Sequence, residues 1–415
     1  MAMTRRTTLV LTVGLAVVLL WLLAGCRDAD QQHTAEDPIG ELRASSAGNG
    51  SSGGDQDTEI SNGKIAFIRH HDIYVMNSDG TGQTNLTSTK VGEGGHVWSP
   101  NGKKIAFVAK SAGERSPDIY VINADGTGET NLTKTKASTE AAPSWSPDSK
   151  KITYLRGSDP SGELFTDIYV MNSDGSSQTR PIKARDTKYF EAGFESPEWS
   201  PDGQKIAFVR TTRMVPDKSA PSSAVPATGP SSLYVMKPDG TGLRKLSKEI
   251  SYAQSPLWSP VWSPDGKKIA FSGAGEKGEK NYIVNSGGTE LRELLPNVRD
   301  HISSYSWSPN GEKIAFAAAH YRGELDVYVT DADGTGRSNL TSTKTIIEDE
   351  PSWSPDGKHI AFTRGEVGDF YFDQDIYVMN ADGSRLTRLA NKASSPAFAP
   401  QYKVERLRGA KRART

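Results

Sequence analysis

The sequence predicts an all-β protein, a seven-bladed β-propeller built of four-stranded antiparallel blades. Three observations predict this fold. The string Ile-Ala-Phe, once varied to Ile-Thr-Tyr, occurs seven times, each copy is followed by a second apolar run, and each second run meets a Gly-containing turn. The spacing of about 40 to 63 residues fits one four-stranded blade with its loops. The copies begin at Ile65, Ile105, Ile152, Ile206, Ile269, Ile314 and Ile360.

The two ends of the repeat array predict that the ring closes on itself. Trp-Ser-Pro precedes six of the copies, but nothing equivalent precedes the copy at Ile65. The missing string stands at the far end of the array, in residues 396–400, with Phe398 in place of Trp. A closed ring explains both half-repeats, because the C-terminal strand would then complete the first blade. The count of seven depends on this closure, and a six-bladed ring is the alternative.

Each repeat divides into four short strands. The Trp-Ser-Pro segment is the first, and Pro-Asp-Gly then forms a tight turn because Pro presets φ and Asp and Gly tolerate turn geometry. Ile-Ala-Phe is the second strand, and the run typified by Asp-Ile-Tyr-Val is the third, rich in β-branched and aromatic residues. An Asp-Gly hairpin leads to the fourth strand. The middle strands are apolar at successive positions, which is expected when neighbouring sheets cover both faces.

These strings resemble a known family. Trp-Ser-Pro-Asp-Gly-Lys-Lys-Ile-Ala-Phe, in residues 262–271, and Asp-Ile-Tyr-Val-Met-Asn-Ala-Asp-Gly, in residues 375–383, look like the TolB-type propeller repeat. The resemblance covers residues 61–400 and implies a propeller that works in the bacterial envelope. TolB pairs a six-bladed ring with an N-terminal α/β domain, whereas this chain has seven repeats behind a short linker.

The N-terminus predicts export and lipid attachment. Arg5 and Arg6 precede an apolar run over residues 9–24, which ends in Leu-Ala-Gly and Cys26. This string resembles the lipobox of bacterial lipoproteins, so residues 1–25 are predicted to be a signal peptide and Cys26 the lipidated residue. An uncleaved transmembrane anchor is the alternative, because the run is close to the length that spans a bilayer. Both place the rest of the chain outside the cytoplasm.

Composition divides the remaining chain. Residues 26–60 are acidic, rich in Gly and Ser, and typical of a solvated linker, residues 61–402 form the propeller, and residues 403–415 form a basic tail. The tail either contacts anionic lipid or is a frayed terminus. The net charge of −1 offers no general argument for nucleic-acid binding. We expect a monomer held to the membrane through Cys26.

Loop lengths predict which face binds. The turns between first and second strands and between third and fourth strands are short, whereas the other connections vary, most of all over residues 210–231. Variable loops on a rigid scaffold usually carry binding, so we expect an envelope protein, peptide or glycan on that face. Acidic, histidine and aromatic residues there form the predicted binding rim. This rim has two interpretations: it is a site that binds a cation or a basic peptide, or it is a hydrated polar funnel. Its residues are His96, Glu140, Glu195, His301, Glu348, Glu350, Phe370, Tyr371 and Phe372.

No catalytic, metal or cofactor motif is recognised, so the prediction is a non-catalytic binding scaffold. The Gly-x-Ser-x-Gly match at residues 50–54 lies in the linker, without the strand and helix that a nucleophile elbow needs. We expect no peptidase domain after the propeller, since few residues follow Pro400. The alternative is a metal-assisted glycan lyase or hydrolase at the channel mouth. It requires three clustered imidazoles, and we expect no such cluster among His70, His71, His96, His301 and His320.

Overall fold

The computed structural model describes most of the repeat region. Its described residues are 63–88, 93–110, 116–135, 138–157, 166–182, 190–214, 228–248, 258–275, 278–296, 302–319, 324–366 and 374–400. They contain strands and turns and no α-helix, so the prediction of an all-β fold is confirmed. Within these ranges no helix is present that could cross a membrane. Cys26, the linker and the basic tail lie outside the described residues.

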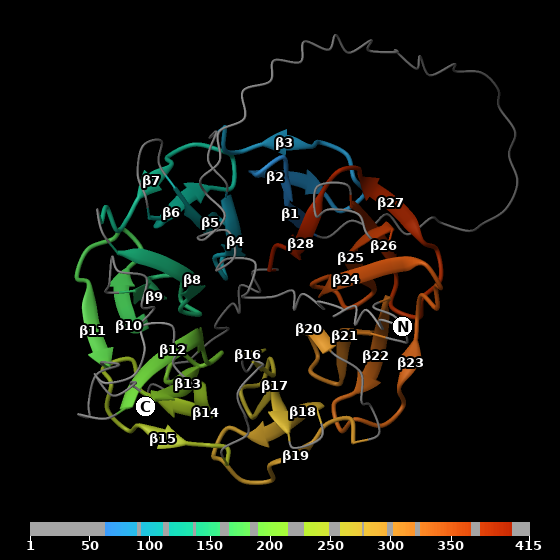
Figure 1. Cartoon of the computed structure of the whole chain (residues 1–415). Helices are drawn as coiled ribbons and strands as arrows, with labels where there is room; N and C mark the ends of the chain where they lie inside the picture. The colour runs from blue at the N-terminus through green and yellow to red at the C-terminus, as the bar shows by residue number, and fades with distance from the viewer. Residues whose placement is uncertain are drawn as a thin grey trace, which may run out of the picture.

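The strands occupy four radial positions (Figure 1). The innermost are β4 (Glu93–Trp98), β8 (Thr139–Trp145), β12 (Phe190–Trp199), β16 (Trp258–Trp262), β20 (Ile302–Trp307), β24 (Ile346–Trp353) and β28 (Ser394–Phe398). The second are β1 (Lys64–Arg69), β5 (Lys104–Ala109), β9 (Lys151–Gly157), β13 (Ile206–Met214), β17 (Lys268–Gly275), β21 (Lys313–Ala319) and β25 (His359–Glu366). The third are β2 (Asp72–Asn77), β6 (Asp118–Asn123), β10 (Thr166–Asn172), β14 (Thr228–Met236), β18 (Gly278–Asn285), β22 (Leu325–Asp331) and β26 (Asp375–Asn380). The outermost are β3 (Thr84–Asn85), β7 (Thr130–Asn131), β11 (Thr179–Ile182), β15 (Arg244–Lys245), β19 (Arg292–Glu293), β23 (Ser338–Asn339) and β27 (Thr387–Ala390).

Hydrogen bonding groups the described strands into five four-stranded sheets and one eight-stranded sheet, which divides into two four-stranded antiparallel units, and all these units are arranged in a ring. We number them as blades in chain order. Blade 1 is β28-β1-β2-β3, blade 2 is β4–β7, blade 3 is β8–β11, blade 4 is β12–β15, blade 5 is β16–β19, blade 6 is β20–β23 and blade 7 is β24–β27. Blades 6 and 7 are additionally joined by one parallel pair, Leu325 with Ile347.

The C-terminal strand closes the ring as predicted. β28 pairs antiparallel with β1, and Phe398 stands opposite Ile65 while Ala397 stands opposite Ala66. The backbone NH of Ala399 donates to the carbonyl of Lys64 at 2.7 Å. The blue start and the red end of the described chain therefore share one sheet in Figure 1.

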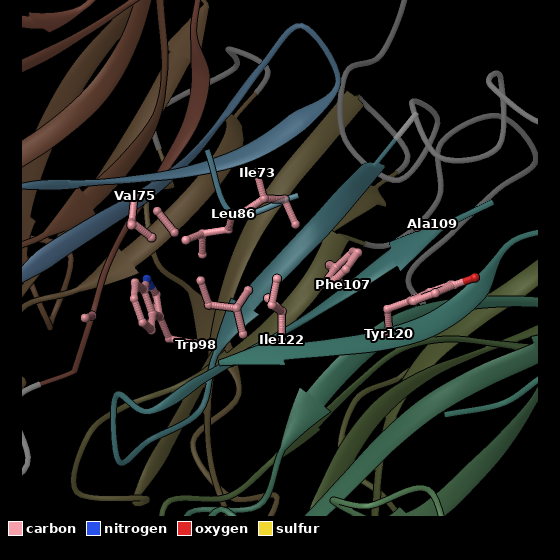
Figure 2. Packing of buried hydrophobic residues seen from close by; sticks show 11 residues of the cluster. Ile73, Val75, Leu86, Trp98, Phe107, Ala109, Tyr120 and Ile122 are labelled. Carbon is pink, nitrogen blue, oxygen red and sulfur yellow. The ribbon is translucent and has the colours of Figure 1, made fainter. Parts of the chain in front are cut away.

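Apolar side chains fill the spaces between blades. Ile73, Val75 and Leu86 of blade 1 meet Trp98, Phe107 and Ile122 of blade 2 (Figure 2). The second and third strands contribute residues to both faces, and β5 is buried at five consecutive positions. Such strands need a neighbour on each side, which explains why their apolar residues do not alternate with polar ones.

A hydrogen bond between inner strands joins each blade to the next. The donor is always the last residue of an inner strand, and the acceptor is the residue just before the corresponding Trp, or just before Phe398, in the preceding blade. At four junctions an indole Nε1 donates to a backbone carbonyl: Trp98 to Ala397, Trp145 to Val97, Trp262 to Glu198 and Trp307 to Val261. At the other three a backbone NH donates to a Ser Oγ: Trp199 to Ser144, Trp353 to Ser306 and Phe398 to Ser352. Phe398 can replace Trp because its junction uses the backbone NH.

The short turns lie on one face, as predicted. Ala124, in the turn between β6 and β7, donates its NH to the carbonyl of Lys103, in the turn before β5, at 2.9 Å. Equivalent bonds occur in blades 3, 5, 6 and 7. We call this side the short-turn face and the opposite side the long-loop face. In the hairpins of the short-turn face, except that of blade 5, an Asp carboxylate accepts from the residue two positions on, as Asp333 does from the NH and Oγ1 of Thr335.

The long connection of blade 4 is shorter than the sequence predicted. Residues 210–214 belong to β13 and residues 228–231 to β14, and Arg213 pairs with Thr228. β12 is lengthened to match, because Phe190 pairs with Met214. The hairpin therefore extends beyond the length of its counterparts, and only residues 215–227 lie outside the described residues.

Candidate functional site

The described residues of the predicted rim lie within inner strands rather than before them. The sequence placed the start of each inner strand near Trp-Ser-Pro, whereas β8 already begins at Thr139 and β24 at Ile346. His96, Glu140, Glu195, Glu348 and Glu350 are consequently strand residues whose side chains meet neighbouring strands. His301, Phe370, Tyr371 and Phe372 lie outside the described residues.

Glu140 is a buried ion-pair partner. Its side chain is fully buried, and its Oε1 lies 2.7 Å from Nε of Arg156 on β9. Thr135 Oγ1 donates to the other carboxylate oxygen at 2.8 Å. Burial raises the pKa of Glu140 to about 8, because desolvation disfavours the charged carboxylate. The prediction that Glu140 stands at an open channel mouth is therefore wrong.

Asp118, at the start of β6, ties this pair to blade 2. Its Oδ1 accepts from the NH of Thr135 at 3.0 Å and from Thr133 Oγ1 at 2.8 Å. Its Oδ2 accepts from Nδ2 of Asn131 at 2.7 Å. Asn131 begins the Asn-Leu-Thr triplet of residues 131–133, which therefore serves both the outer strand and the junction between blades.

The same four residue types, Asp, Thr, Glu and Arg, make equivalent contacts between blades 6 and 7. Glu348 is fully buried, with Oε1 3.4 Å from Nη1 of Arg364 on β25. Thr343 Oγ1 donates to Glu348, and its NH donates to Asp326 at 2.9 Å. Glu348, too, is therefore unavailable at an open rim. We call each Asp-Thr-Glu-Arg set a clasp.

Glu350 fastens the strand that closes the ring. Its Oε2 accepts from the NH of Ser395 on β28 at 2.8 Å and from Thr363 Oγ1 at 2.9 Å. Ser395 Oγ bonds the remaining carboxylate oxygen at 3.0 Å. Burial and the neighbouring charge of Asp349 raise the pKa of Glu350. Glu350 has a φ of 56°, at a point where the pairing of β24 with β25 shifts register.

Glu195 makes its contact within blade 4, whereas His96 is buried against blade 1. Glu195 Oε1 accepts from Thr211 Oγ1 at 3.2 Å, within blade 4. His96 is 8% exposed and lies beside backbone carbonyls of Ala66 and Ser395. Burial lowers the pKa of His96 to about 4, even though the two carbonyls favour the protonated ring. His96 Nε2 is buried and has no hydrogen-bond partner among the described residues.

The rim residues that the structure describes do not converge on one point. His96 lies against blade 1, Glu140 and Glu348 belong to separate clasps, and Glu350 holds the closing strand. Among the residues that the structure describes, no group of three His, Cys, Asp or Glu side chains could hold a metal ion. His301 and His320 are not among those residues.

The other members of the clasps were not predicted from the sequence. Arg156, Arg364, Asp118 and Asp326 were not singled out, although a signal exists. In both clasps the bonded Asp and Thr are 17 residues apart and the bonded Thr and Glu are 5 apart. Such identical spacing in two repeats indicates a shared contact.

These features define a class of protein, a closed β-propeller of repeated antiparallel blades with structural polar contacts between its inner strands. The chain belongs to the TolB β-propeller domain family, which it matches over residues 63–219 and 230–404.

Individual relatives fall into different functional classes. The chain is 30% identical over 186 residues to the Bacillus subtilis (strain 168) uncharacterized peptidase YuxL, covering 44% of this chain and 24% of that protein. It therefore spans about a quarter of the length of this curated relative. Oligogalacturonate lyase from Vibrio parahaemolyticus is similar in structure, with a TM-score of 0.54, 15% identity, and coverage of 80% of this chain and 86% of that chain. For a prolyl endopeptidase structure the TM-score is 0.56 and the identity 14%, covering 80% of this chain and 50% of that one. At such low identity these two likenesses show the fold alone.

Proposed function

We propose that the protein is a lipid-anchored, extracytoplasmic scaffold that binds an envelope protein, peptide or glycan on its long-loop face and performs no chemistry. The observation that carries this proposal is the difference between the two faces. The short-turn face repeats the same backbone hydrogen bonds from blade to blade, as in Ala124 to Lys103 and Ala381 to Lys358. The connections of the long-loop face range from the two-residue turn at His70 and His71 to the extended hairpin of blade 4.

Binding without catalysis is supported by how the polar residues are used. A catalytic acid needs access to substrate, whereas Glu140 and Glu348 are fully buried in clasps and Glu350 accepts bonds from the closing strand. These contacts give the carboxylates a structural role in holding blades together.

A metal-assisted lyase is the second candidate, since a lyase shares this fold. Its test is titration of the purified protein with Mn²⁺ by calorimetry, followed by incubation with oligogalacturonate. Stoichiometric binding together with release of unsaturated products would establish the enzyme and overturn the scaffold.

Anchoring is testable through Cys26. We expect mass spectrometry of the N-terminal peptide from membrane-purified protein to show a diacylglycerol-modified Cys26. We expect Cys26→Ser to leave the membrane fraction. An unmodified Cys26 in a membrane-bound protein would favour the uncleaved anchor instead.

Binding is testable by loop replacement. Residues 215–227 are replaced by a two-residue Asn-Gly turn, which keeps the described pair Arg213 and Thr228. The control is Lys267→Glu, an exposed residue on the short-turn face. We expect cross-linking of envelope partners in intact cells to weaken with the replaced loop and to persist with Lys267→Glu. The reverse result would place binding on the short-turn face.

A further inference from the structure

We propose that the short-turn face is the membrane-proximal side and that the long-loop face is presented away from the anchoring bilayer, toward a partner outside that bilayer. This inference rests on the proposed anchor at Cys26. It adds an orientation, and therefore a direction from which the partner must approach.

The described part of the chain begins and ends on the same side of the propeller. Gly63, just before β1, would place an added Cβ 3.5 Å from the carbonyl oxygen of Ala399 and 3.6 Å from Cγ of Pro355. Pro355 belongs to the short turn between β24 and β25. β28 ends at Phe398 on this same side, and Ala399 donates to Lys64. Both the linker and the tail are therefore joined to the short-turn face.

Strand direction makes this placement a consequence of the ring closure. β1 is a second strand and runs away from the short-turn face, toward the turn at His70 and His71. β28 is an inner strand and runs toward the short-turn face. Because the chain enters blade 1 at its second strand and completes it with an inner strand, both ends must emerge on the short-turn side.

The length of the linker limits how far the ring can rotate relative to the plane of the bilayer. About 36 residues separate Cys26 from Gly63, and a solvated chain of that length has a root-mean-square extent of roughly 33 Å. A domain of some 340 residues has a radius of gyration of about 20 Å. Bringing the long-loop face to the bilayer would require the linker to pass around the ring, whereas the short-turn face is reached directly.

The charge on the short-turn face does not by itself decide which face of the ring lies near the bilayer. The short-turn face carries exposed lysines, including Lys103 and Lys358, together with exposed aspartates, including Asp125 and Asp382. The pKa values of both aspartates are lowered by hydrogen bonds, so these groups are charged at neutral pH. With both signs present, the attachment point rather than attraction to lipid headgroups determines which side lies near the membrane.

The sequence permits a direct test, because Cys26 is the only cysteine and is blocked once lipidated. Lys358→Cys places a thiol on the short-turn face, and Lys392→Cys places one on the long-loop face, between β27 and β28. Both lysines are exposed. Each lipidated variant is labelled with a fluorophore and reconstituted into neutral phosphatidylcholine vesicles containing a spin-labelled phosphatidylcholine.

We expect the label at position 358 to be quenched at least twofold more than the label at position 392. Deleting residues 32–55 should widen the difference, because a shorter linker restricts turning. Equal quenching, or stronger quenching at position 392 with the shortened linker, overturns the orientation. A vesicle flotation assay distinguishes a wrong orientation from failure of the lipid anchor. If wild type and Cys26→Ser float equally poorly, the anchoring proposal is wrong and the orientation with it.

Discussion

The indole nitrogen of Trp98 donates a hydrogen bond of 3.0 Å to the backbone carbonyl of Ala397, across 299 residues of sequence. This contact joins blade 2 to the strand that closes blade 1. Equivalent junctions use either the indole or the backbone NH, so Trp residues that look identical in the sequence make different contacts.

Replacing these Trp residues by Phe should separate the two kinds of junction. Trp98→Phe removes the indole donor to the carbonyl of Ala397, and we expect it to lower the free energy of unfolding by about 1 kcal/mol more than Trp353→Phe. Trp353 is the matched control, because it is 7% exposed and its Nε1 has no hydrogen-bond partner in the described part of the chain. Urea unfolding measures the difference. Equal losses would show that the indole bond adds no stability.

Shortening the side chain of Phe398, on the strand that closes the ring, should lower the free energy of unfolding. Phe398 is 8% exposed and packs with Ile65 and Ile376, so we expect Phe398→Ala to cost about 3 kcal/mol through lost burial and the cavity left behind. Leu386→Ala is the control, since Leu386 is 45% exposed, and it should change stability by less than about 0.5 kcal/mol. Thermal unfolding of both variants checks this. A small loss at Phe398 would mean that β28 contributes little to closure.

Breaking a clasp should leave a buried carboxyl group without its partner. Burial raises the pKa of Glu140 to about 8, so this group is largely protonated at neutral pH once Arg156 is removed. Arg156→Met takes the guanidinium away from the fully buried Glu140, and we expect a loss of about 2 kcal/mol at neutral pH. Lys313→Met is the control, because the side chains of Lys313 and Asp331 are 47% and 43% exposed, and such pairs contribute about 1 kcal/mol or less. The double variant Arg156→Met with Glu140→Gln should recover part of the loss. No recovery would point to lost packing of Arg156 on Tyr169, whose ring centroid lies 4.4 Å from the guanidinium carbon.

Two hairpin glycines should respond differently to alanine. Gly334 has a φ of +80°, and an added Cβ would lie 1.8 Å from the carbonyl oxygen of Leu294 in the preceding blade. We therefore expect Gly334→Ala to cost at least about 2 kcal/mol. Gly287, in the equivalent turn of blade 5, has no atom of the described residues within 4 Å of an added Cβ, and Gly287→Ala should be nearly neutral. Differential scanning calorimetry distinguishes them, and similar melting temperatures would refute the close approach.

His96 should make the protein sensitive to acid. Burial depresses its pKa from 6.5 to about 4, so the folded state binds the proton less tightly than the unfolded state does. Its contribution is present above pH 6.5 and is lost as the pH falls toward 4, by about 2 to 3 kcal/mol in total. His96→Gln cannot titrate, so its stability should fall less over this range. Parallel curves for wild type and variant between pH 6.5 and 4 would contradict this account.

Some features could be predicted from the sequence because they repeat or are local. The recurrence of Ile-Ala-Phe predicted the second strands, the unmatched residues 396–400 predicted the closing strand, and the Asp-Gly pairs predicted the hairpins. The candidate site could not be predicted in this way. Glu140 and Glu350 lie two positions apart in the repeat, yet one is held by Arg156 in its own blade and the other by Ser395 in the next. Their partners depend on which strand lies alongside.

The sequence by itself determined that strands of this kind recur and that one half-repeat stands at each end of the array, since turn chemistry and apolar runs are properties of short segments. Only the tertiary structure decided which carboxylates are buried and what holds them. A side chain is desolvated by neighbours brought from distant parts of the chain, as Ser395 is brought to Glu350. Closure of the ring is the physical step that assembles those neighbours, and it also sets both described ends on one face.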